Sequence, residues 1–460
     1  MAVLLAGTAL GLWQVKPPRA DGDSPAYRRM MSSIQRLTEA PHPNGSAEIG
    51  RVRADILAEI ESMGVTPLVE AEEVTELDAI DYFLRRDAGM TLEEWWAQNK
   101  DALAEDGITR PEDNFTISES PEPVVVYNIL AKLDAPGTDK GVMFVSHYDS
   151  APGAPGAADD MAAVCAMLEA LREQSQNGAL RNDLYFLFTD GEEEGMLGAW
   201  EFVTAHPEMK DMIELAVNLE SRGNSGAVLL FETSPKAYGL VSAAVKSGAK
   251  PVGTSWAAAV YAMMPNYTDL TAFLYHGYAG INFAAVEGVE TYHMPSDTYE
   301  NLNRDTAWQY LQTTLALSDY AARSTVSGLN DNPREGVYFP FLPGVLILIS
   351  AFWSYMLGLL ACGAALAYIV FEIRGKRLKI TFTHVLMGLL LLLSAGTMAL
   401  FPSGSYLFYI PLLMMAVTAF LKRRKAAHIL VSAAGGIVTL LLWVPVLFLL
   451  WVTMIQPMML

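Results

Sequence analysis

Cysteine is scarce in this chain of 460 residues. Only Cys165 and Cys362 are present, so the sequence offers no disulfide framework and no cluster of thiolates for a structural metal ion. Both lie in predicted helices, where cysteine usually acts as a small buried hydrophobic residue. Any metal site must therefore be built from histidine and carboxylate side chains.

Positive charge and compact catalytic motifs are also lacking. The chain has 31 Lys and Arg against 51 Asp and Glu, which gives a formal net charge of −20. Nucleic acids bind clustered Lys and Arg, so this balance argues against a nucleic-acid partner. The sequence contains no H-E-x-x-H, G-x-S-x-G or G-x-G-x-x-G motif and no P-loop.

Acidic residues almost vanish from the C-terminal part of the chain. From Val337 onward the only acidic residue is Glu372. This part consists of successive uncharged apolar runs, each close to the length of about 20 residues that crosses a bilayer. The basic residues fall in two clusters, 374–379 and 422–425, and positively charged loops stay in the cytoplasm. We predict about four transmembrane helices: residues 343–370, 384–401, 406–421 and 428–452.

These features divide the chain into three parts. Residues 1–20 are a candidate N-terminal membrane anchor, residues 21–335 an acidic domain outside the cytoplasm, and residues 336–460 an all-α transmembrane region in contact with lipid. The extracytoplasmic side would be a periplasm, an organelle lumen or the cell surface. Within the acidic domain, residues 71–122 are expected to form an insertion or lid. Small residues such as Gly358 in the transmembrane region predict close helix contacts and a candidate homo-oligomer interface.

The acidic domain alternates between strand and helix patterns. Two helical patterns, at 25–38 and 46–63, precede the acidic stretch at residues 71–122. Beyond it, apolar strand-like runs occupy 141–147, 184–189, 214–219, 227–232 and 279–285. Helical patterns lie between and after them, at 159–174, 195–205, 235–248 and 304–325. Such alternation predicts an α/β domain with a largely parallel central sheet between helices.

Possible metal ligands follow several of these strands. His147 and Glu220 end two strands, Glu193 follows a third, and His293 follows a fourth by a few residues. Asp159 opens the helical pattern after the first strand. Because ligands bind beyond the carboxyl ends of strands in open α/β sheets, we expect these side chains to meet at one edge. Histidine with carboxylate is a ligand set that suits a catalytic zinc site.

Each residue alone also has a structural explanation. His147 could be a hydrogen-bonded histidine at a strand end, and Asp159 and Asp160 could cap a helix. The acidic run at 192–194 would suit the positive end of a helix dipole, and Glu220 could be a solvated strand end. The joint pattern favours metal, because the structural explanation needs several coincidences at one edge of one sheet.

Five motifs in order resemble a known family. SHYDS, the Asp-Asp pair at 159–160, DGEEEGMLGA, NLE and YHMPSDT look like the motifs of the two-zinc aminopeptidase and glutamate carboxypeptidase family of metallopeptidases. The resemblance covers about residues 120–325. The stretches ADDMAAVCAMLEALR and NLESRG are most similar to its membrane-bound endoplasmic reticulum metallopeptidase branch. The resemblance implies a zinc-exopeptidase fold.

The resemblance also implies residue roles. Asp159 would bridge two zinc ions, and Glu192 would be the general base of the hydrolysis. Asp149 would fix the orientation of a ligating imidazole. Most family members have Asp where Glu220 stands, which leaves open whether one ion or two are bound. The implied ligands are His147, Asp159 and Glu220 for one ion and Asp159, Glu193 and His293 for the other.

The expected function is that of a membrane-anchored zinc exopeptidase, most simply an aminopeptidase, that hydrolyses short peptides with a zinc-activated water. Arg222, Tyr267, Asp269 and Tyr292 are candidate substrate-binding residues, and Arg222 would suit a free carboxylate. Two alternatives on the same fold are a single-zinc acyltransferase similar to glutaminyl cyclase and a non-catalytic membrane chaperone or receptor. Two, one or no zinc ions per chain would separate the three.

Overall fold

The structure of the chain is a computed structural model. It describes residues 16–105, 123–138, 140–262, 264–331, 333–342, 344–360 and 363. These residues belong to two compact units. The first unit comprises residues 1–253, 267–333 and 340–346 and holds every predicted site residue. The second comprises residues 254–266, 334–339 and 347–460.

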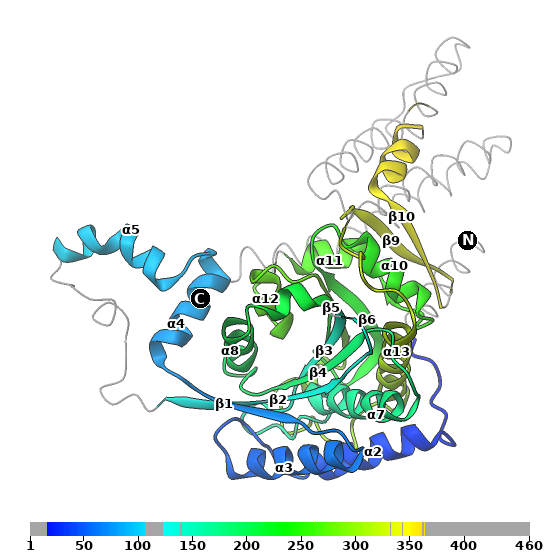
Figure 1. Cartoon of the computed structure of the whole chain (residues 1–460), viewed down its shortest axis with the longest axis horizontal. Coiled ribbons are helices and arrows are strands. Elements are labelled where there is room, and N and C mark those ends of the chain that lie inside the picture. Colours follow the sequence, from blue (N-terminus) through cyan, green and yellow to red (C-terminus); the bar gives the residue numbers. More distant parts are fainter. Residues whose placement is uncertain are drawn as a thin grey trace, which may run out of the picture. The chain divides into compact units, whose positions relative to one another are not determined.

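An eight-stranded sheet forms the centre of the first unit (Figure 1). Its central strands are parallel neighbours in the order β4 (Asp183–Thr189), β3 (Gly141–His147), β5 (Ile213–Ser221) and β8 (Gly280–Glu287). Every residue of β3, β4 and β5 is buried, as expected of parallel strands covered on both faces. The predicted α/β class and largely parallel central sheet are confirmed.

Antiparallel neighbours flank this parallel centre. On one side β2 (Val124–Leu133) pairs with β4, and β1 (Leu68–Val74) pairs with β2. On the other side β6 (Ser225–Thr233) pairs antiparallel with β8, and the short β7 (Val252–Gly253) follows it. The sheet thus places the carboxyl ends of four buried parallel strands at one edge.

Helices cover both faces of the sheet (Figure 1). On one face α8 (Leu197–Ala205) and α12 (Asp269–Tyr275) enclose an apolar cluster with side chains of β3 and β5, in which Trp200 and Phe273 are fully buried. On the other face α7 (Ala162–Gln176) packs against α13 (Arg304–Arg323) and α2 (Pro25–Leu37). Among the described residues of the first unit outside the 71–122 stretch, the remaining helices longer than one turn are α3 (Ala47–Ser62) and α10 (Tyr238–Lys246).

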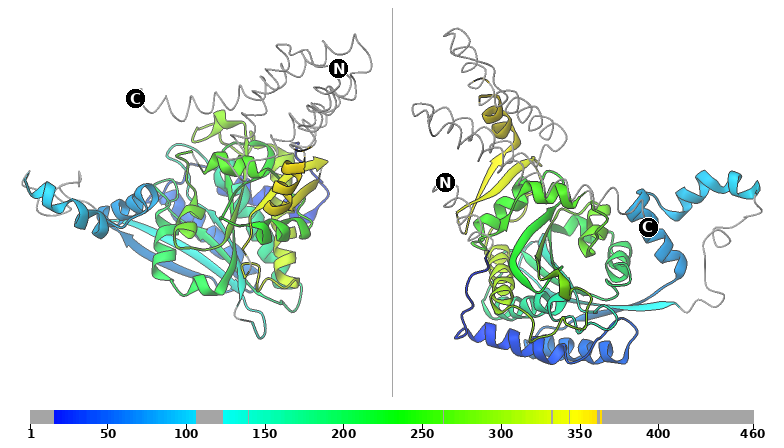
Figure 2. Two further views of the ribbon diagram at one scale, coloured as in Figure 1. Left: turned by 90° about the horizontal axis from the view of Figure 1, so that it is seen from above. Right: turned by 180° about the vertical axis from the view of Figure 1, so that it is seen from behind.

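The stretch expected as an insertion begins inside the sheet. Its first residues belong to β1, and α4 (Glu76–Ala88) and α5 (Leu92–Glu105) follow. The views in Figures 1 and 2 show α5 extending away from the layers around the sheet. Residues 106–122 lie outside the described part.

The predicted membrane spans lie mostly outside the described residues, as do residues 1–15 of the candidate anchor. Within the part that is described, no helix has both the length and the apolar character to cross a bilayer. The predicted start of the first span at residue 343 is wrong as a helix. β10 (Val345–Ser350) pairs with β9 (Gly336–Leu342), and helical structure begins at Ala351. The β-branched run before Ala351 favours a strand.

Besides the helical segment that begins at Ala351, the described residues of the second unit include the short helix α11 (Ser255–Tyr261). Thr254 caps it by accepting a hydrogen bond from the amide of Ala257. The Ser255 hydroxyl accepts a hydrogen bond from the Tyr338 amide at 2.7 Å and donates one to the Tyr338 carbonyl oxygen. These bonds connect two segments of this unit that are far apart in sequence.

Candidate metal centre

The ends of the parallel strands bring the predicted ligands together. His147 is the last residue of β3 and Glu220 lies near the end of β5. Glu193 lies between β4 and α8, and His293 follows β8 and the short helix η2 (Val289–Thr291). Asp159 lies in the short turn η1 (Ala157–Met161) between β3 and α7, where its own backbone is not helical (φ −112°, ψ 87°). The expected meeting at one edge of the sheet is observed.

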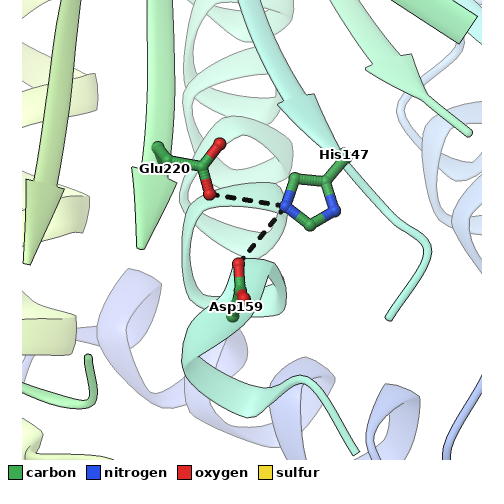
Figure 3. A group of neighbouring side chains, drawn as sticks. All are labelled: His147, Asp159 and Glu220. Carbon is green, nitrogen blue, oxygen red and sulfur yellow. Dashed lines mark ion pairs between the residues drawn. The ribbon is translucent and has the colours of Figure 1, made fainter. Parts of the chain in front are cut away.

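His147, Asp159 and Glu220 form what we call the first group (Figure 3). The Nε2 atom of His147 lies 3.3 Å from Asp159 Oδ1 and 3.5 Å from Glu220 Oε1. All three side chains are buried or nearly so. Figure 3 shows both carboxylates facing the same ring nitrogen, and the three ligand atoms lie within 4.8 Å of one another, so they could hold one ion together.

Asp159, Glu193 and His293 form the second group. The Nε2 atom of His293 lies 2.8 Å from Glu193 Oε2 and 3.5 Å from Asp159 Oδ2. His293 is 40% exposed, whereas His147 is 1% exposed. Asp159 thus presents one carboxylate oxygen to each group, which is the arrangement of a ligand that bridges two ions.

The chemistry of the two groups fits a pair of divalent cations such as zinc. Among the described residues, His147 Nε2 and Glu193 Oε1 are buried atoms that lack a hydrogen-bond partner. An orphaned buried polar atom is costly, and a bound cation would supply the missing partner to both. Nitrogen and carboxylate oxygen without sulfur are typical ligands of catalytic zinc.

The pKa values of Glu193 and His293 also favour a bound cation at this site. Burial raises the pKa of Glu193 to about 7, with the Asp159 carboxylate adding to the increase. Burial alone would lower the pKa of His293, but its hydrogen bonds with Asp159 and Glu193 raise it to about 9. Both shifts reflect an excess of carboxylates in a buried place, which divalent cations would offset.

Asp149 contacts His147 of the first group on the side away from the other two ligands. Its main-chain carbonyl oxygen lies 3.1 Å from Nδ1 of His147, and its carboxylate oxygen lies 3.4 Å from the same nitrogen. Since a carbonyl oxygen only accepts, Nδ1 carries the proton and Nε2 faces the other two residues of the group. The Asp149 carboxylate also accepts hydrogen bonds at 3.2 Å from the amides of Glu192 and Glu193.

Glu192 lies beside both groups. Burial raises its pKa well above the ordinary range, and the negative charges of Glu220 and Glu193 add to this effect. Its amide is held by Asp149, as described above. A carboxyl group with raised proton affinity beside the ligand groups is a candidate for proton transfer.

The helix-cap explanation for the aspartate pair is wrong. The α7 helix begins only at Ala162, and no side chain caps its N-terminus by a hydrogen bond. Instead, Asp160 is fully buried and accepts a hydrogen bond of 2.5 Å from the Ser146 hydroxyl. The peptide bond between Asp159 and Asp160 is cis. Asp160 thus supports the turn and Asp159 faces the site.

Asp297 is a residue of the site to which the sequence analysis assigned no role. Its carboxylate accepts hydrogen bonds from the amides of Ala158 and Asp159, at 2.9 and 3.1 Å. Its place in YHMPSDT, four residues after His293, is the signal that could have identified it. The turn that Asp297 contacts lies more than 130 residues away in sequence, and no local sequence pattern predicts such a contact.

The candidate substrate residues do not lie together. Tyr292 stacks on His293 with 3.7 Å between ring centroids, and the Arg222 guanidinium lies 4.5 Å from the Tyr292 ring. Tyr267 instead lies against α4, where it donates a hydrogen bond to Asp87 at 2.9 Å. Asp269 is buried and accepts a hydrogen bond from the Thr189 hydroxyl, and its role as a substrate-contacting residue stays a prediction.

The chain is similar to known proteins. Residues 128–318 match Peptidase family M28. The chain is 28% identical to endoplasmic reticulum metallopeptidase 1 of Mus musculus over 69% of this chain and 36% of that protein. It is 31% identical to a vacuolar membrane protease of Eremothecium gossypii over 59% of this chain and 27% of that protein. The matched region thus spans about a third of the length of these curated relatives.

A solved structure is also similar. The aminopeptidase from Aneurinibacillus sp. strain AM-1 aligns with 65% of this chain and 94% of its own, at 16% identity and a TM-score of 0.47.

Proposed function

Residues 128–318 form a Peptidase family M28 domain, and from this premise we propose that the chain is a zinc-dependent exopeptidase that removes residues from the amino end of short peptides. The single observation that carries the proposal is the position of Asp159. Its two carboxylate oxygens serve two groups of three potential ligands each. A helix cap or a solvated strand end would not bring two histidines and two further carboxylates to the same side chain.

In this proposal the first group holds one zinc ion and the second group the other, with Asp159 shared. When bound, the ions supply Lewis-acid polarisation of a peptide carbonyl and lower the pKa of water towards about 7. Asp149 keeps the Nδ1 proton of His147 in place, so that Nε2 offers its lone pair to the ion.

Glu192 acts as the general base and then as the general acid. Its carboxylate takes a proton from the attacking water and returns that proton to the nitrogen of the leaving amine. Two features favour this role. The Asp149 carboxylate accepts a hydrogen bond from the Glu192 amide and so holds its backbone, and burial raises the Glu192 pKa well above its ordinary value.

Tyr292 and Arg222 are the proposed substrate contacts. Burial raises the pKa of the Tyr292 phenol, so that it keeps its proton and can donate a hydrogen bond to a peptide carbonyl oxygen. The ring stacks on His293, which puts Tyr292 beside the second group. Arg222 lies against the same ring.

The same proposal places the peptidase domain on a membrane, outside the cytoplasm. The name of one relative, endoplasmic reticulum metallopeptidase 1, includes an organelle, and that of the other, vacuolar membrane protease, includes a membrane. In the helical segment after β10, large apolar side chains are exposed: Phe352, Trp353, Leu357, Leu359 and Leu360. Exposed aromatic and aliphatic residues of this kind suit a membrane interface. The positively charged loops in the sequence support the sidedness.

The test combines metal content with cleavage. Full-length chain should contain two zinc ions and should hydrolyse peptides with a free amino end but not N-blocked ones. One ion would favour a single-zinc acyltransferase, and none would favour a non-catalytic protein. Glu192→Gln should fold and bind zinc, yet lose a factor of about 100 to 10,000 in turnover.

Glu194→Gln is the matched control, because Glu194 is the exposed neighbour in the same acidic run and should retain full activity. Near-normal turnover of Glu192→Gln would refute its assignment as the base.

A further inference from the structure

Asp297 contributes no atom to either ligand group, yet it binds the turn that carries Asp159. We propose that Asp297 is the positioning residue that assembles the second group, and that the second ion depends on it more than the first. The inference rests on the two-metal part of the proposed function. It concerns metal binding alone and does not depend on which peptides are cleaved.

Three consecutive amides of the η1 turn bind this one residue. Asp297 accepts hydrogen bonds from Ala158 and Asp159 through its two carboxylate oxygens. Its main-chain carbonyl oxygen accepts a third from Ala157 at 3.2 Å. The residue is only 2% exposed, so these bonds are shielded from competing water. The turn that presents Asp159 therefore has its position set by the loop after β8.

That loop is the one that carries His293. Its backbone is closed by hydrogen bonds from the Asp297 amide to the Met294 carbonyl and from the Met294 amide to the Thr291 carbonyl. His293 lies inside this closed turn with a φ of 56°, an uncommon value for a residue other than glycine. A bond from Asp297 to the η1 turn thus fixes His293 and Asp159 relative to each other.

In the first group only the shared Asp159 depends on this contact. His147 and Glu220 lie on strands of the central sheet, where they pair with Thr189 and Ala284. The side chain of Glu220 is 11% exposed and that of His147 is 1% exposed. Loss of the Asp297 contact should therefore disturb the shared Asp159 somewhat and the position of His293 much more.

The experiment measures zinc binding by full-length chain after metal removal, by calorimetry and by elemental analysis of the dialysed protein. Asp297→Asn keeps the shape but replaces one accepting oxygen by a donor that faces an amide. We expect wild type to bind two ions. The variant should retain one at near wild-type affinity and bind the other at least ten times more weakly. Cobalt substitution should show the absorption of one site instead of two.

Asp183→Asn is the matched control. Asp183 is also buried, at 4% exposure, and accepts a hydrogen bond from the Ala135 amide at 2.8 Å, but it lies at the start of β4, far from the ligands. Both variants should unfold at lower temperature than wild type. Only Asp297→Asn should lose the second ion, and Asp297→Glu should recover part of that loss because it restores a carboxylate.

Unchanged affinity for both ions in Asp297→Asn would overturn the inference and leave the proposed function intact. Equal weakening of both ions would overturn it too. A wild-type chain that binds no zinc would refute the proposed function and the inference together, and one that binds a single ion would refute the two-site premise of both and favour the single-zinc alternative.

If Asp297→Asn fails to fold, amide hydrogen exchange in the metal-free wild-type chain tests the contact between Asp297 and the η1 turn instead. Protected amides at Ala158 and Asp159 are expected, and rapid exchange of both would contradict the contact.

Discussion

Glu232 is a buried carboxylate outside the two ligand groups, and its pKa affects the stability of the fold. It lies on β6, where it accepts a hydrogen bond of 2.9 Å from the Asn282 side chain. That side chain also donates to the hydroxyl of Thr268, which precedes α12. Burial raises the Glu232 pKa to about 7, and the charge of Glu220 adds to the increase. The folded state therefore holds a proton on Glu232 that the unfolded chain releases at lower pH.

This shift has a defined sign. Between the unfolded pKa of about 4.3 and the folded value, the native state binds more protons, so stability falls as pH rises through that window. Glu232→Gln keeps the acceptor for Asn282 and removes the buried charge. At pH 8 it should stabilise the fold by on the order of 1–3 kcal/mol, and near pH 4 the difference should vanish. Denaturant unfolding at both pH values measures this.

Glu173→Gln, on the exposed side of α7, is the control for that measurement and should change little at either pH. A destabilised Glu232→Gln at pH 8 would show that the charged form is favourably paired in the folded state.

Among single residues, sequence reasoning reached those whose identity is fixed by chemistry and spacing. His147, Glu193 and His293 follow strands in recognisable motifs, and the structure places them where the motifs predict. Tyr267 and Asp269 stay predictions as substrate contacts, and their contacts with α4 and β4 could not be read from their loop. The sequence holds the residue types but not the contacts between distant segments.

At the level of elements, the acidic loop after β4 is sensitive to α4. Gly195 has a φ of 112°, and a Cβ atom there would lie 2.8 Å from Cε1 of Phe83 on α4. Gly195→Ala thus meets both an unfavourable backbone conformation and a ring that must shift. Because Glu192 and Glu193 precede this glycine closely, we expect activity to fall at least tenfold along with a drop in stability. Peptide cleavage and thermal unfolding measure the two effects.

Gly178→Ala separates the two causes. Gly178 has a φ of 85° but open space around the added atom, and it lies between α7 and β4. It should cost stability without loss of turnover. Combining Gly195→Ala with Phe83→Ala should recover part of the activity, and no recovery would mean that the backbone conformation alone is responsible.

Elements with a strong apolar period were predictable, and polar or short ones were not. The predicted strand at 141–147 coincides with β3, and the helical patterns at 25–38 and 304–325 correspond to α2 and α13. In contrast, β1 has the sequence LVEAEEV and is largely exposed, so its acidic residues hide the strand pattern. Its strand state comes from pairing with β2 at the edge of the sheet, which is a tertiary effect.

For the whole molecule, the carboxylates gathered at one edge imply that bound metal stabilises the fold. Asp159, Glu193 and Glu220 lie within a few ångströms of the same histidines, and Glu192 adds a further acid. A chelator should therefore lower the unfolding temperature. At zinc concentrations 100 times the dissociation constant, the linkage amounts to about 2.7 kcal/mol. Thermal unfolding with chelator, and again after zinc is restored, measures it.

Magnesium serves as the control cation, because it favours oxygen ligands over imidazole and should restore little of the lost stability. An unfolding temperature that is unaffected by chelator would contradict a tightly bound metal centre.

The shared carboxylate of Asp159 also limits how such a centre can be simplified. A substitution at that position removes a donor from both groups at once, so it cannot yield a chain that keeps one ion and discards the other. A single-ion descendant is reached only by changing Glu193 or His293, or else His147 or Glu220, each of which belongs to one group. In the proposed two-ion centre, Asp159 is thus the one ligand whose loss affects both ions at once.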